Sequence, residues 1–339
     1  MRQLVFAGTG RFSVDDVESR PLGEHEVRVR VLAAGICGSD VHGFTGANDR
    51  RQPGQVMGHE AVGEIIETVN GAEGPAIGDI VVINPVISCG ACLRCSQSQQ
   101  NLCEERRIVG CVPELPGAFA DEVVVPTPNA IPFAGGAPAE WGSLVEPFAV
   151  GAHAASRAGS IEGRSAVIIG GGPIGLGAAL AVERQAPRRL LVVEPIAHRR
   201  GLLERLGFVV VAPGNAELQG GAFEVVIECV GHAATVVDAM RLAAPAGVIV
   251  VPGLGEPSVP IPMADLVMGE RTIAGTAVYT PEDFRATAEW VASGERDLGP
   301  VIEGGVELEE LPGVFDGYAD GSLTAFKTIF RPSDRLTAR

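Results

Sequence analysis

Apolar positions divide the chain into two differently patterned parts. Up to about residue 145 they occur in short β-branched runs that glycine and proline interrupt, which is typical of a compact β-rich domain. The clearest predicted strands cover residues 27–31, 61–69, 80–83 and 122–125. The first part of the chain is therefore expected to form a β-rich core.

From Ser165 onward, apolar runs of strand length alternate with helical patterns. The predicted strands are 165–169, 189–194, 223–228 and 248–251, and the predicted helices are 174–185, 198–206 and 233–243. This alternation and spacing predict a parallel, doubly wound α/β sheet.

After about residue 275 the pattern becomes irregular again. One helix is predicted at 281–293, with Thr280 as its N-cap and Pro281 at its first helical position. Because this segment is too short for a core of its own, we expect it to return to the first domain.

Composition agrees with two domains. The chain has 339 residues, of which 46% are hydrophobic, and a domain usually takes about 100–200 residues. Its 42 acidic and 26 basic residues give a net charge of −16, which argues against nucleic acid or an anionic membrane surface as partner, because both require a positive field. No apolar run approaches the ~20 residues of a membrane helix, and the first residues lack a signal peptide's apolar core, so we expect a soluble cytoplasmic protein.

Four of the seven cysteines lie close together in the sequence. Cys89, Cys92, Cys95 and Cys103 follow the pattern C-x2-C-x2-C-x7-C in a loop of about residues 88–104. Four thiolates on a short loop can enclose a zinc ion tetrahedrally and leave no position for a substrate, which predicts a structural zinc. Two disulfides or free buried thiols are the alternatives, and a reducing compartment disfavours the disulfides.

A second set of candidate ligands is spread along the chain. Cys37 stands in GICGSDVH, His59 and Glu60 in GHE, and Glu146 in SLVEP. Three or four such ligands with an open position describe a catalytic zinc, which acts as a Lewis acid and lowers the pKa of an alcohol. Taken singly, each residue is more often a core cysteine, a loop histidine or a carboxylate before a turn, so the assignment depends on the motif that follows.

The motif GGGPIGLG directly follows a predicted apolar strand. It contains G-x-G-x-x-G at Gly170, Gly172 and Gly175, which would permit a tight turn, close approach of the backbone to a pyrophosphate, and close helix–strand packing. Pro173 and Ile174 begin the next helix, whose unpaired N–H groups are expected to face the phosphates. The motif in this position predicts dinucleotide binding.

Glu194 ends the second predicted strand of this domain, where a carboxylate accepts hydrogen bonds from the ribose hydroxyls of the adenosine. A 2′-phosphate there would meet like charge, which favours NAD over NADP. Arg199 and Arg200 follow within a turn, and either could meet a phosphate or brace the ribose, so NADP stays open. A solvated strand-end carboxylate is the alternative interpretation of Glu194.

These motifs occur in the order found in one enzyme family. The chain resembles the zinc-containing medium-chain alcohol dehydrogenases, and more closely their polyol branch, typified by sorbitol and threonine dehydrogenases. The resemblance covers nearly the whole chain. The matching segments are GICGSDVHGF, MGHEAVGEI, the four-cysteine loop, GAFADEVVVP, SLVEPFAVGAHA, the glycine-rich turn and FEVVIECVG.

The resemblance implies roles for the second set of ligands. Cys37 and His59 would bind the catalytic zinc, and Glu60 would be a ligand or a near neighbour that moves in and out. Glu146 takes the place that many alcohol dehydrogenases fill with cysteine, and its role stays open between direct ligand and water-bridged neighbour. Asp40 would orient the His59 imidazole.

Ser39 and His42 match the proton relay of the family. A hydroxyl beside the reacting alcohol, linked through ribose hydroxyls to an outer histidine, would export the proton. Otherwise Ser39 is a turn residue and His42 a solvated side chain. Arg50 and Arg51 fall in a loop that should border the substrate, where surface charge is the default interpretation and binding of an acidic or phosphorylated substrate the alternative.

The resemblance also sets the overall expectation. A GroES-like, β-rich catalytic domain would comprise residues 1–147 and 277–339, and a Rossmann domain residues 148–276. The enzyme would oxidise a secondary alcohol of a polyol, sugar alcohol or amino alcohol reversibly, with NAD(P), two zinc ions per subunit, and a homodimeric or homotetrameric assembly. The alternatives are a zinc-free enoyl or quinone reductase of the same superfamily and a non-catalytic, nucleotide-sensing zinc protein. Cys111 and Cys229 receive no role beyond that of small buried side chains.

Overall fold

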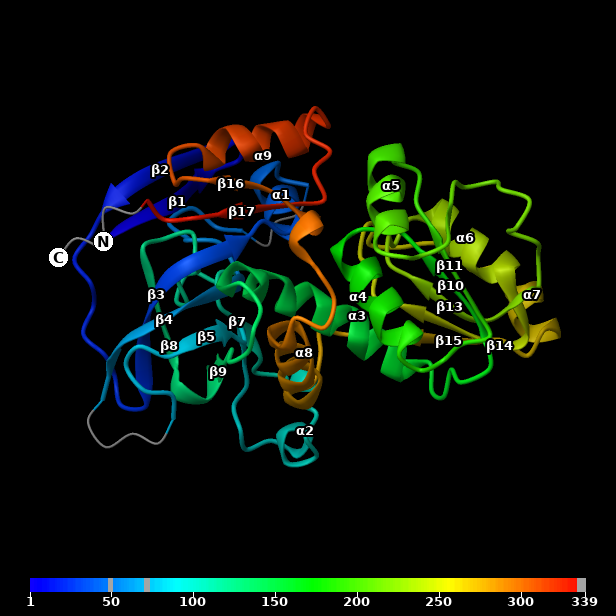
Figure 1. Ribbon diagram of the computed structural model, residues 1–339, viewed down its shortest axis with the longest axis horizontal. Coiled ribbons are helices and arrows are strands. Elements are labelled where there is room, and N and C mark those ends of the chain that lie inside the picture. The colour runs from blue at the N-terminus through cyan, green and yellow to red at the C-terminus, as the bar shows by residue number, and fades with distance from the viewer. Residues whose placement is uncertain (48–50, 70–73, 334–339) are drawn as a thin grey trace. The chain divides into compact units, whose positions relative to one another are not determined.

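The computed structural model describes residues 1–47, 51–69 and 74–333. Backbone contacts divide the chain into two compact units. Residues Met1–Glu146 and Phe284–Arg339 form unit 1, and residues Pro147–Asp283 form unit 2. Each unit has a sheet and a hydrophobic core of its own (Figure 1).

Unit 1 is built from both ends of the chain. The elements of its N-terminal part are β1 (Arg2–Gly8), β2 (Arg11–Asp16), β3 (Glu26–Gly35), α1 (Gly38–Phe44), β4 (Glu60–Thr68), β5 (Ile80–Ile83), β6 (Val86–Ile87), α2 (Leu93–Ser96), β7 (Arg107–Ile108), β8 (Glu122–Pro126) and β9 (Ala130–Pro132). Its C-terminal part contains most of α8 (Pro281–Ser293), followed by β16 (Ile302–Val306), α9 (Leu311–Asp320) and β17 (Lys327–Phe330). Short 3-10 turns cover Gln100–Leu102, Thr127–Asn129, Ala139–Leu144 and Gly299–Val301.

The long strand β3 lies at the centre of the seven-stranded sheet of unit 1. The strands are ordered β16-β17-β3-β4-β5-β9, and β8 also pairs with β3. Val27, Val29 and Val31 of β3 are buried, and the two-residue period of a strand turns them to one face, toward the core. The C-terminal strand β17 is antiparallel to β3, so the end of the chain completes the sheet that its beginning starts.

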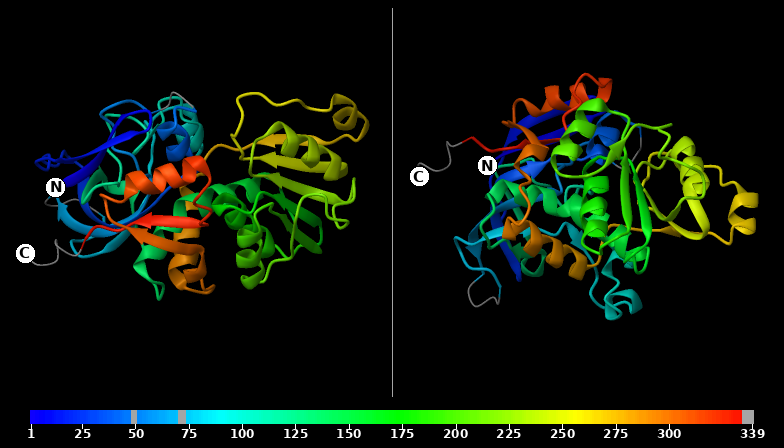
Figure 2. Two further views of the ribbon diagram at one scale, coloured as in Figure 1. Left: turned by 90° about the horizontal axis from the view of Figure 1, so that it is seen from above. Right: turned by 45° about the vertical axis from the view of Figure 1, so that its right-hand side comes forward.

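Phenylalanines from distant segments close the core of unit 1. The rings of Phe12 and Phe44 stack with their centroids 4.9 Å apart, and Phe315 of α9 packs edge-on against both. Phe119 contacts Phe315 as well, in an edge-to-face arrangement. Helix α9 runs beside β16 and β17 in the different views of Figure 1 and Figure 2, which places it over this aromatic cluster.

Unit 2 contains a parallel sheet with its connecting helices. Its elements are α3 (Val145–Arg157, which begins at the boundary), β10 (Ser165–Ile169), α4 (Pro173–Glu183), β11 (Arg189–Val193), α5 (Ala197–Arg205), β12 (Val210–Val211), β13 (Phe223–Glu228), α6 (Ala233–Leu242), β14 (Ala243–Val251), α7 (Met263–Met268) and β15 (Thr272–Gly275). The strand order is β12-β11-β10-β13-β14-β15, and every neighbouring pair is parallel.

The direction of winding in this sheet reverses between β10 and β13. The chain moves outward from β10 to β12, returns to β13, and then moves the other way to β15. Because parallel crossovers are right-handed, α4 and α5 cover one face of the sheet and α6 covers the other. The predicted parallel, doubly wound sheet is thereby confirmed, with its switch point at the strand that precedes the glycine-rich turn.

Strand bounds in unit 2 follow the sequence pattern closely. The predicted strands 165–169 and 223–228 are β10 and β13 with the same bounds. Strand β14 begins at Ala243 rather than at Val248, because the chain passes from α6 straight into extended backbone. Within the described part of the chain, none of the helices combines the length and the apolar character that a membrane span needs.

The expectation of a single helix after residue 275 is wrong, because α9 follows. Pro312, Gly313 and Gly317 lower its intrinsic helix propensity, which hid it from sequence patterning. The side chains of Leu311 and Phe315 are completely buried in the core of unit 1. Tertiary packing therefore stabilises a helix that local preference does not.

Candidate active site

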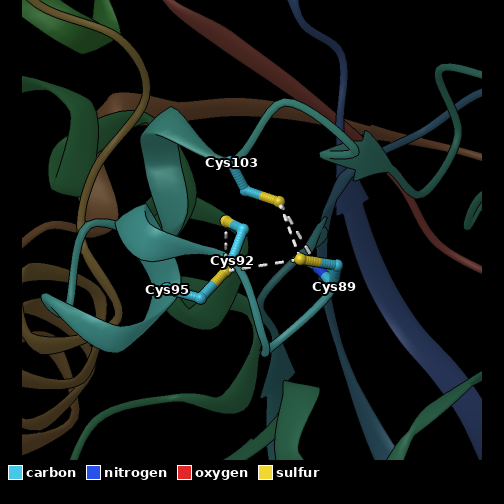
Figure 3. A group of neighbouring side chains, drawn as sticks. All are labelled: Cys89, Cys92, Cys95 and Cys103. Atoms are coloured by element: carbon cyan, nitrogen blue, oxygen red, sulfur yellow. Dashed lines mark hydrogen bonds between the residues drawn. The ribbon is translucent and has the colours of Figure 1, made fainter.

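The four cysteines of the loop around α2 turn their sulfur atoms toward one another (Figure 3). The Sγ atoms lie 3.5 Å apart for Cys92 and Cys95, 3.6 Å for Cys89 and Cys103, and 3.9 Å for Cys89 and Cys95. A tetrahedron with zinc–sulfur bonds of about 2.3 Å has edges of about 3.8 Å. The four free thiols thus fit a structural zinc in geometry as well as in chemistry.

Backbone N–H groups act on two of these thiols. Those of Ala91 and Cys92 lower the pKa of Cys89 to about 7. The backbone N–H of Cys89 also lowers the pKa of Cys103, but burial and hydrogen bonding with the Cys89 thiol outweigh it and raise that pKa to about 11. Because zinc binds thiolates, the lowered pKa of Cys89 favours the form of this side chain that can bind the metal.

A second group of ligand atoms comes from Cys37, His59 and Glu60. One atom of each side chain lies within 4.8 Å of the others. Cys37 caps the N-terminus of α1, where its sulfur accepts a hydrogen bond from the Ser39 backbone N–H. His59 and Glu60 stand at the start of β4, which pairs with the end of β3. A soft thiolate, an imidazole and a carboxylate are the donor set of an open zinc site.

Asp40 and Arg51 stand behind the imidazole of His59. Asp40 Oδ2 lies 3.5 Å from His59 Nδ1, as expected for a residue that orients the ring. Burial lowers the pKa of His59, but the negative groups Asp40, Cys111 and Cys37 raise it, and the net shift is well upward. The default interpretation of Arg51 as surface charge is wrong: it is buried and donates a hydrogen bond to Asp40, while Arg50 lies outside the described residues.

Lys327 is a residue of this region that sequence reasoning missed. It lies on β17, is buried, and donates a hydrogen bond to Glu60 Oε2 and another to the carbonyl of Ile36. Burial lowers the pKa of Lys327, but Glu60 and Cys37 raise it, and the net shift is upward. The sequence did contain one signal for it: Lys327 is the only lysine in the chain, and it lies in an apolar strand.

The remaining predicted residues lie at different distances from this group. Glu146 is buried in the first turn of α3, and the group of ligand atoms within 4.8 Å does not include it. Ser39 Oγ donates a hydrogen bond to Cys37 Sγ over 3.3 Å, whereas His42 is exposed in the last turn of α1. Cys111, to which the sequence assigned no role, has its sulfur 4.0 Å from His59 Nδ1.

The glycine-rich turn connects β10 to α4. Gly170 has a φ of +94°, which glycine adopts readily, and Gly172 precedes α4, whose first residue is Pro173. A Cβ at residue 175 would lie 1.8 Å from the Gly170 carbonyl oxygen, so glycine there permits close packing of the helix against the turn. Within the described residues no side chain caps the N-terminus of α4, and its N–H groups fit a phosphate-binding role. Ile174 lies in the first turn of the helix.

Glu194 follows β11 and lies beside the glycine-rich turn. Its carboxylate accepts hydrogen bonds from the backbone N–H groups of Gly171 and Ile196, over 2.9 Å and 2.8 Å. Arg200 Nη1 donates hydrogen bonds to the backbone carbonyls of Glu194 and Pro195. These bonds disfavour binding of a cofactor phosphate by this group. Arg199 is half-buried on α5. Both carboxylate oxygens of Glu194 are thus held by backbone N–H groups next to the glycine-rich turn.

Comparison with known proteins identifies the class. Residues 23–135 match the family model described as "Alcohol dehydrogenase GroES-like domain", and residues 173–293 match "Zinc-binding dehydrogenase". A 2-dehydro-3-deoxy-L-galactonate 5-dehydrogenase of Pseudoalteromonas atlantica is 31% identical, with 96% of each chain covered. A sorbitol dehydrogenase of Arabidopsis thaliana is 29% identical, with 91% of this chain and 89% of that protein covered.

Solved structures share the whole fold. A zinc-binding dehydrogenase from Sinorhizobium meliloti, bound to NADP, has a TM-score of 0.89 and 29% identity, with 98% and 99% of the two chains covered. Alcohol dehydrogenase TADH from Thermus sp. ATN1 has a TM-score of 0.89 and 27% identity, with 98% and 100% covered. The chain belongs to the zinc-containing medium-chain alcohol dehydrogenase family, with a GroES-like domain and a Rossmann-type domain. It is an NAD(P)-dependent oxidoreductase of that family.

Proposed function

We propose that unit 1 is the catalytic domain of a polyol or sugar-acid dehydrogenase and that unit 2 binds its nicotinamide cofactor. The observation that carries this proposal is the convergence of Cys37, His59 and Glu60 on one point. The names of the relatives narrow the substrate: they are dehydrogenases of galactonate derivatives, sorbitol and threonine. All these substrates carry a secondary alcohol beside further polar groups.

The proposed site residues of unit 1 have two roles: some would bind the metal, and others would transfer the proton. Cys37 and His59 would hold the zinc, with Glu60 as a further carboxylate, and the zinc supplies Lewis-acid polarisation of an alcohol oxygen. Ser39 Oγ lies against the Cys37 sulfur, from where it would accept the alcohol proton while it passes its own proton on through the ribose hydroxyls of the cofactor. His42 follows three residues later on the same face of α1, and its exposed imidazole would deliver the proton to solvent. Glu146 would be a water-bridged neighbour.

The four-cysteine loop would bind the second zinc. Its Cys89, Cys92, Cys95 and Cys103 fill all the coordination positions of a tetrahedral ion, so this zinc would serve the structure of the loop alone. The oxidation of the alcohol would then take place only at the group formed by Cys37, His59 and Glu60.

The cofactor site favours NAD. Gly170, Gly172, Pro173, Ile174 and Gly175 would hold the pyrophosphate at the N-terminus of α4. The charge of Glu194 would attract ribose hydroxyls and repel a 2′-phosphate. Arg199 would lie near the adenosine ribose and moderate that repulsion.

A homodimer through unit 2 is the proposed assembly. In the described part of the chain, β15 is an edge strand of its sheet, and the segment before it exposes Leu254, Met263, Val267 and Met268 by 60% or more. An unpaired strand edge beside exposed apolar side chains is suited to pairing with a second copy. The test is the mass of the protein in solution.

The function is tested by measuring zinc content and activity together. The expected result is two zinc ions per chain and NAD reduction with one or more sugar alcohols, sugar acids, vicinal diols or amino alcohols, assayed with NAD and NADP in parallel. A His59→Ala variant should keep the structural zinc and NADH binding and lose at least ~10³-fold in activity. Normal turnover by this variant would refute the zinc mechanism, and a wild-type chain with one zinc or none would indicate a zinc-free reductase.

A further inference from the structure

A buried ion pair lies behind the proposed catalytic metal ligands. Arg51 Nη2 donates a hydrogen bond to Asp40 Oδ1 over 2.8 Å, and the two side chains are only 4% and 0% exposed. The chain makes room for this contact at Gly43, where a Cβ would lie 2.1 Å from Arg51 Cγ. The side chain of Arg51 thus fits inside the domain because residue 43 has no Cβ, and the charge of Asp40 stabilises it there.

The second oxygen of Asp40 faces His59. Oδ2 lies 3.5 Å from Nδ1 of the imidazole, and among the residues that the structure describes it has no hydrogen-bond partner. With Nδ1 turned toward Asp40, Nε2 is the nitrogen available for a metal. A neutral histidine that binds a metal through Nε2 carries its hydrogen on Nδ1, and that N–H needs an acceptor. Asp40 Oδ2 is therefore matched to the metal-bound form of His59.

Arg51 stabilises the buried carboxylate of Asp40 in this orientation. A buried carboxylate without a partner is costly, and removing one member of a buried pair leaves the other uncompensated. The hydrogen bond from Arg51 also fixes which oxygen of Asp40 points away from His59 and which points toward it. The guanidinium thus acts on the imidazole through the carboxylate between them.

We propose that Arg51 is a positioning residue of the catalytic metal site: it orients Asp40, and through Asp40 it fixes His59 for metal binding. This role rests on the proposed function of the Cys37–His59–Glu60 group as a metal site. It assigns Arg51 neither to the surface nor to the substrate.

Release of zinc from the full-length protein to a colorimetric chelator tests the proposal. The structural zinc provides a reference inside the same molecule, because the two ions should leave in separate phases. In Arg51→Met the catalytic phase should be about 10–100-fold faster, the usual cost of losing such support, while the structural phase is unchanged. Arg51→Lys should restore part of the slow release, since it keeps the charge but loses the planar fork.

Arg28→Met is the matched control. Arg28 is also a buried arginine of unit 1, and it pairs with Glu67 and Glu122 instead of Asp40. This variant should release both zinc ions at the wild-type rates. Faster release of the catalytic zinc from Arg28→Met as well would show a general loss of stability and overturn the specific role of Arg51.

A double variant keeps the test decisive if Arg51→Met does not fold. Asp40→Asn with Arg51→Met removes both charges of the pair, so no uncompensated carboxylate is left, and the catalytic zinc should still leave rapidly. Wild-type release rates in either variant would overturn the proposal. A wild-type chain that binds one zinc contradicts the proposed function itself, whereas a two-zinc wild type with unchanged release in Arg51→Met contradicts only the role of Arg51.

Discussion

Lys327 and Glu60 form a buried ion pair across 267 residues of sequence, with Lys327 Nζ 2.5 Å from Glu60 Oε2. Their side chains are 2% and 1% exposed. Glu60 is one of the proposed metal ligands, and Lys327 is the first residue of β17, the last strand along the chain. The carboxylate of this proposed ligand therefore has a cationic partner of its own.

Replacing Lys327 with methionine should destabilise unit 1 by about 3–5 kcal/mol, because Glu60 would remain buried without its partner. Urea unfolding followed by fluorescence measures the loss. The double variant Glu60→Gln with Lys327→Met should recover most of it, since no charge is then left alone. Equal stability of the single and double variants would contradict the pairing.

Replacing Cys95 with serine should remove the structural zinc and leave the catalytic one. We expect zinc content to fall from two to one per chain and stability to fall by about 2–3 kcal/mol, or roughly 4–12 °C in Tm. Metal analysis and calorimetry give both values. The half-buried Cys229 provides the control, because its serine variant should keep both ions.

Two glycines of the dinucleotide turn should respond differently to alanine. Gly175→Ala should cost more than about 3 kcal/mol, because its Cβ would overlap the Gly170 carbonyl oxygen. Gly172→Ala meets no atom within 4 Å among the described residues and has an ordinary φ of −73°, so stability should hold. NADH affinity should still fall by about tenfold, or ~1.4 kcal/mol, because the Cβ stands where the pyrophosphate approaches. Calorimetry measures the effect on stability, and NADH titration measures the effect on binding. Unchanged NADH binding by Gly172→Ala would contradict the proposal that the cofactor binds at this turn.

Replacing Glu194 with glutamine should shift cofactor preference toward NADP. Removal of the charge relieves repulsion of a 2′-phosphate, and we expect the ratio of kcat/KM for NADP to that for NAD to rise about tenfold, or ~1.4 kcal/mol. Steady-state kinetics with both cofactors measure the ratio. Glu204→Gln, an exposed change on α5, should leave it unaltered. The same ratio in both variants would remove Glu194 from cofactor selection.

Asp283 should stabilise the start of α8 only while it is ionised. Burial raises its pKa, but hydrogen bonds from His153 and Thr280 lower it, and the net shift is below the ordinary value of 3.8. A depressed pKa contributes stability above the unfolded value and loses it as the pH falls through the folded value. Asp283→Asn should therefore cost about 1–3 kcal/mol at pH 7 and progressively less below about pH 3.8.

Urea unfolding at pH 7 and at pH 3 measures this difference. Asp238→Asn serves as control, because in the described part of the chain Asp238 forms an ion pair with Arg241 on an exposed face of α6, and such pairs contribute at most about 0.5 kcal/mol. An equal cost of Asp283→Asn at both pH values would contradict the ionised cap.

Local patterns determine how far the sequence could predict this molecule. The apolar run 165–169 and the glycines after it reveal β10 and its turn, because strand and turn chemistry are both local. The cysteine spacing predicted the convergence of the four thiols for the same reason. The burial of Lys327 was hidden, because its partner Glu60 lies 267 residues away. The burial of Arg51 was hidden as well: its partner Asp40 is 11 residues away, but Asp40 belongs to α1 and Arg51 does not, so no helical or strand period relates them. Pairing between distant segments leaves no periodic trace in the sequence.

The discontinuity of unit 1 has a consequence for how the protein is made. At about 5–20 residues per second, the ribosome adds the 267 residues that separate Glu60 from Lys327 in roughly 15–50 s. During this time the whole of unit 2 emerges and can fold, while the sheet of unit 1 still lacks β16 and β17. A nascent chain thus presents its cysteine, histidine and glutamate to cellular metal before the competing ammonium group has been synthesised.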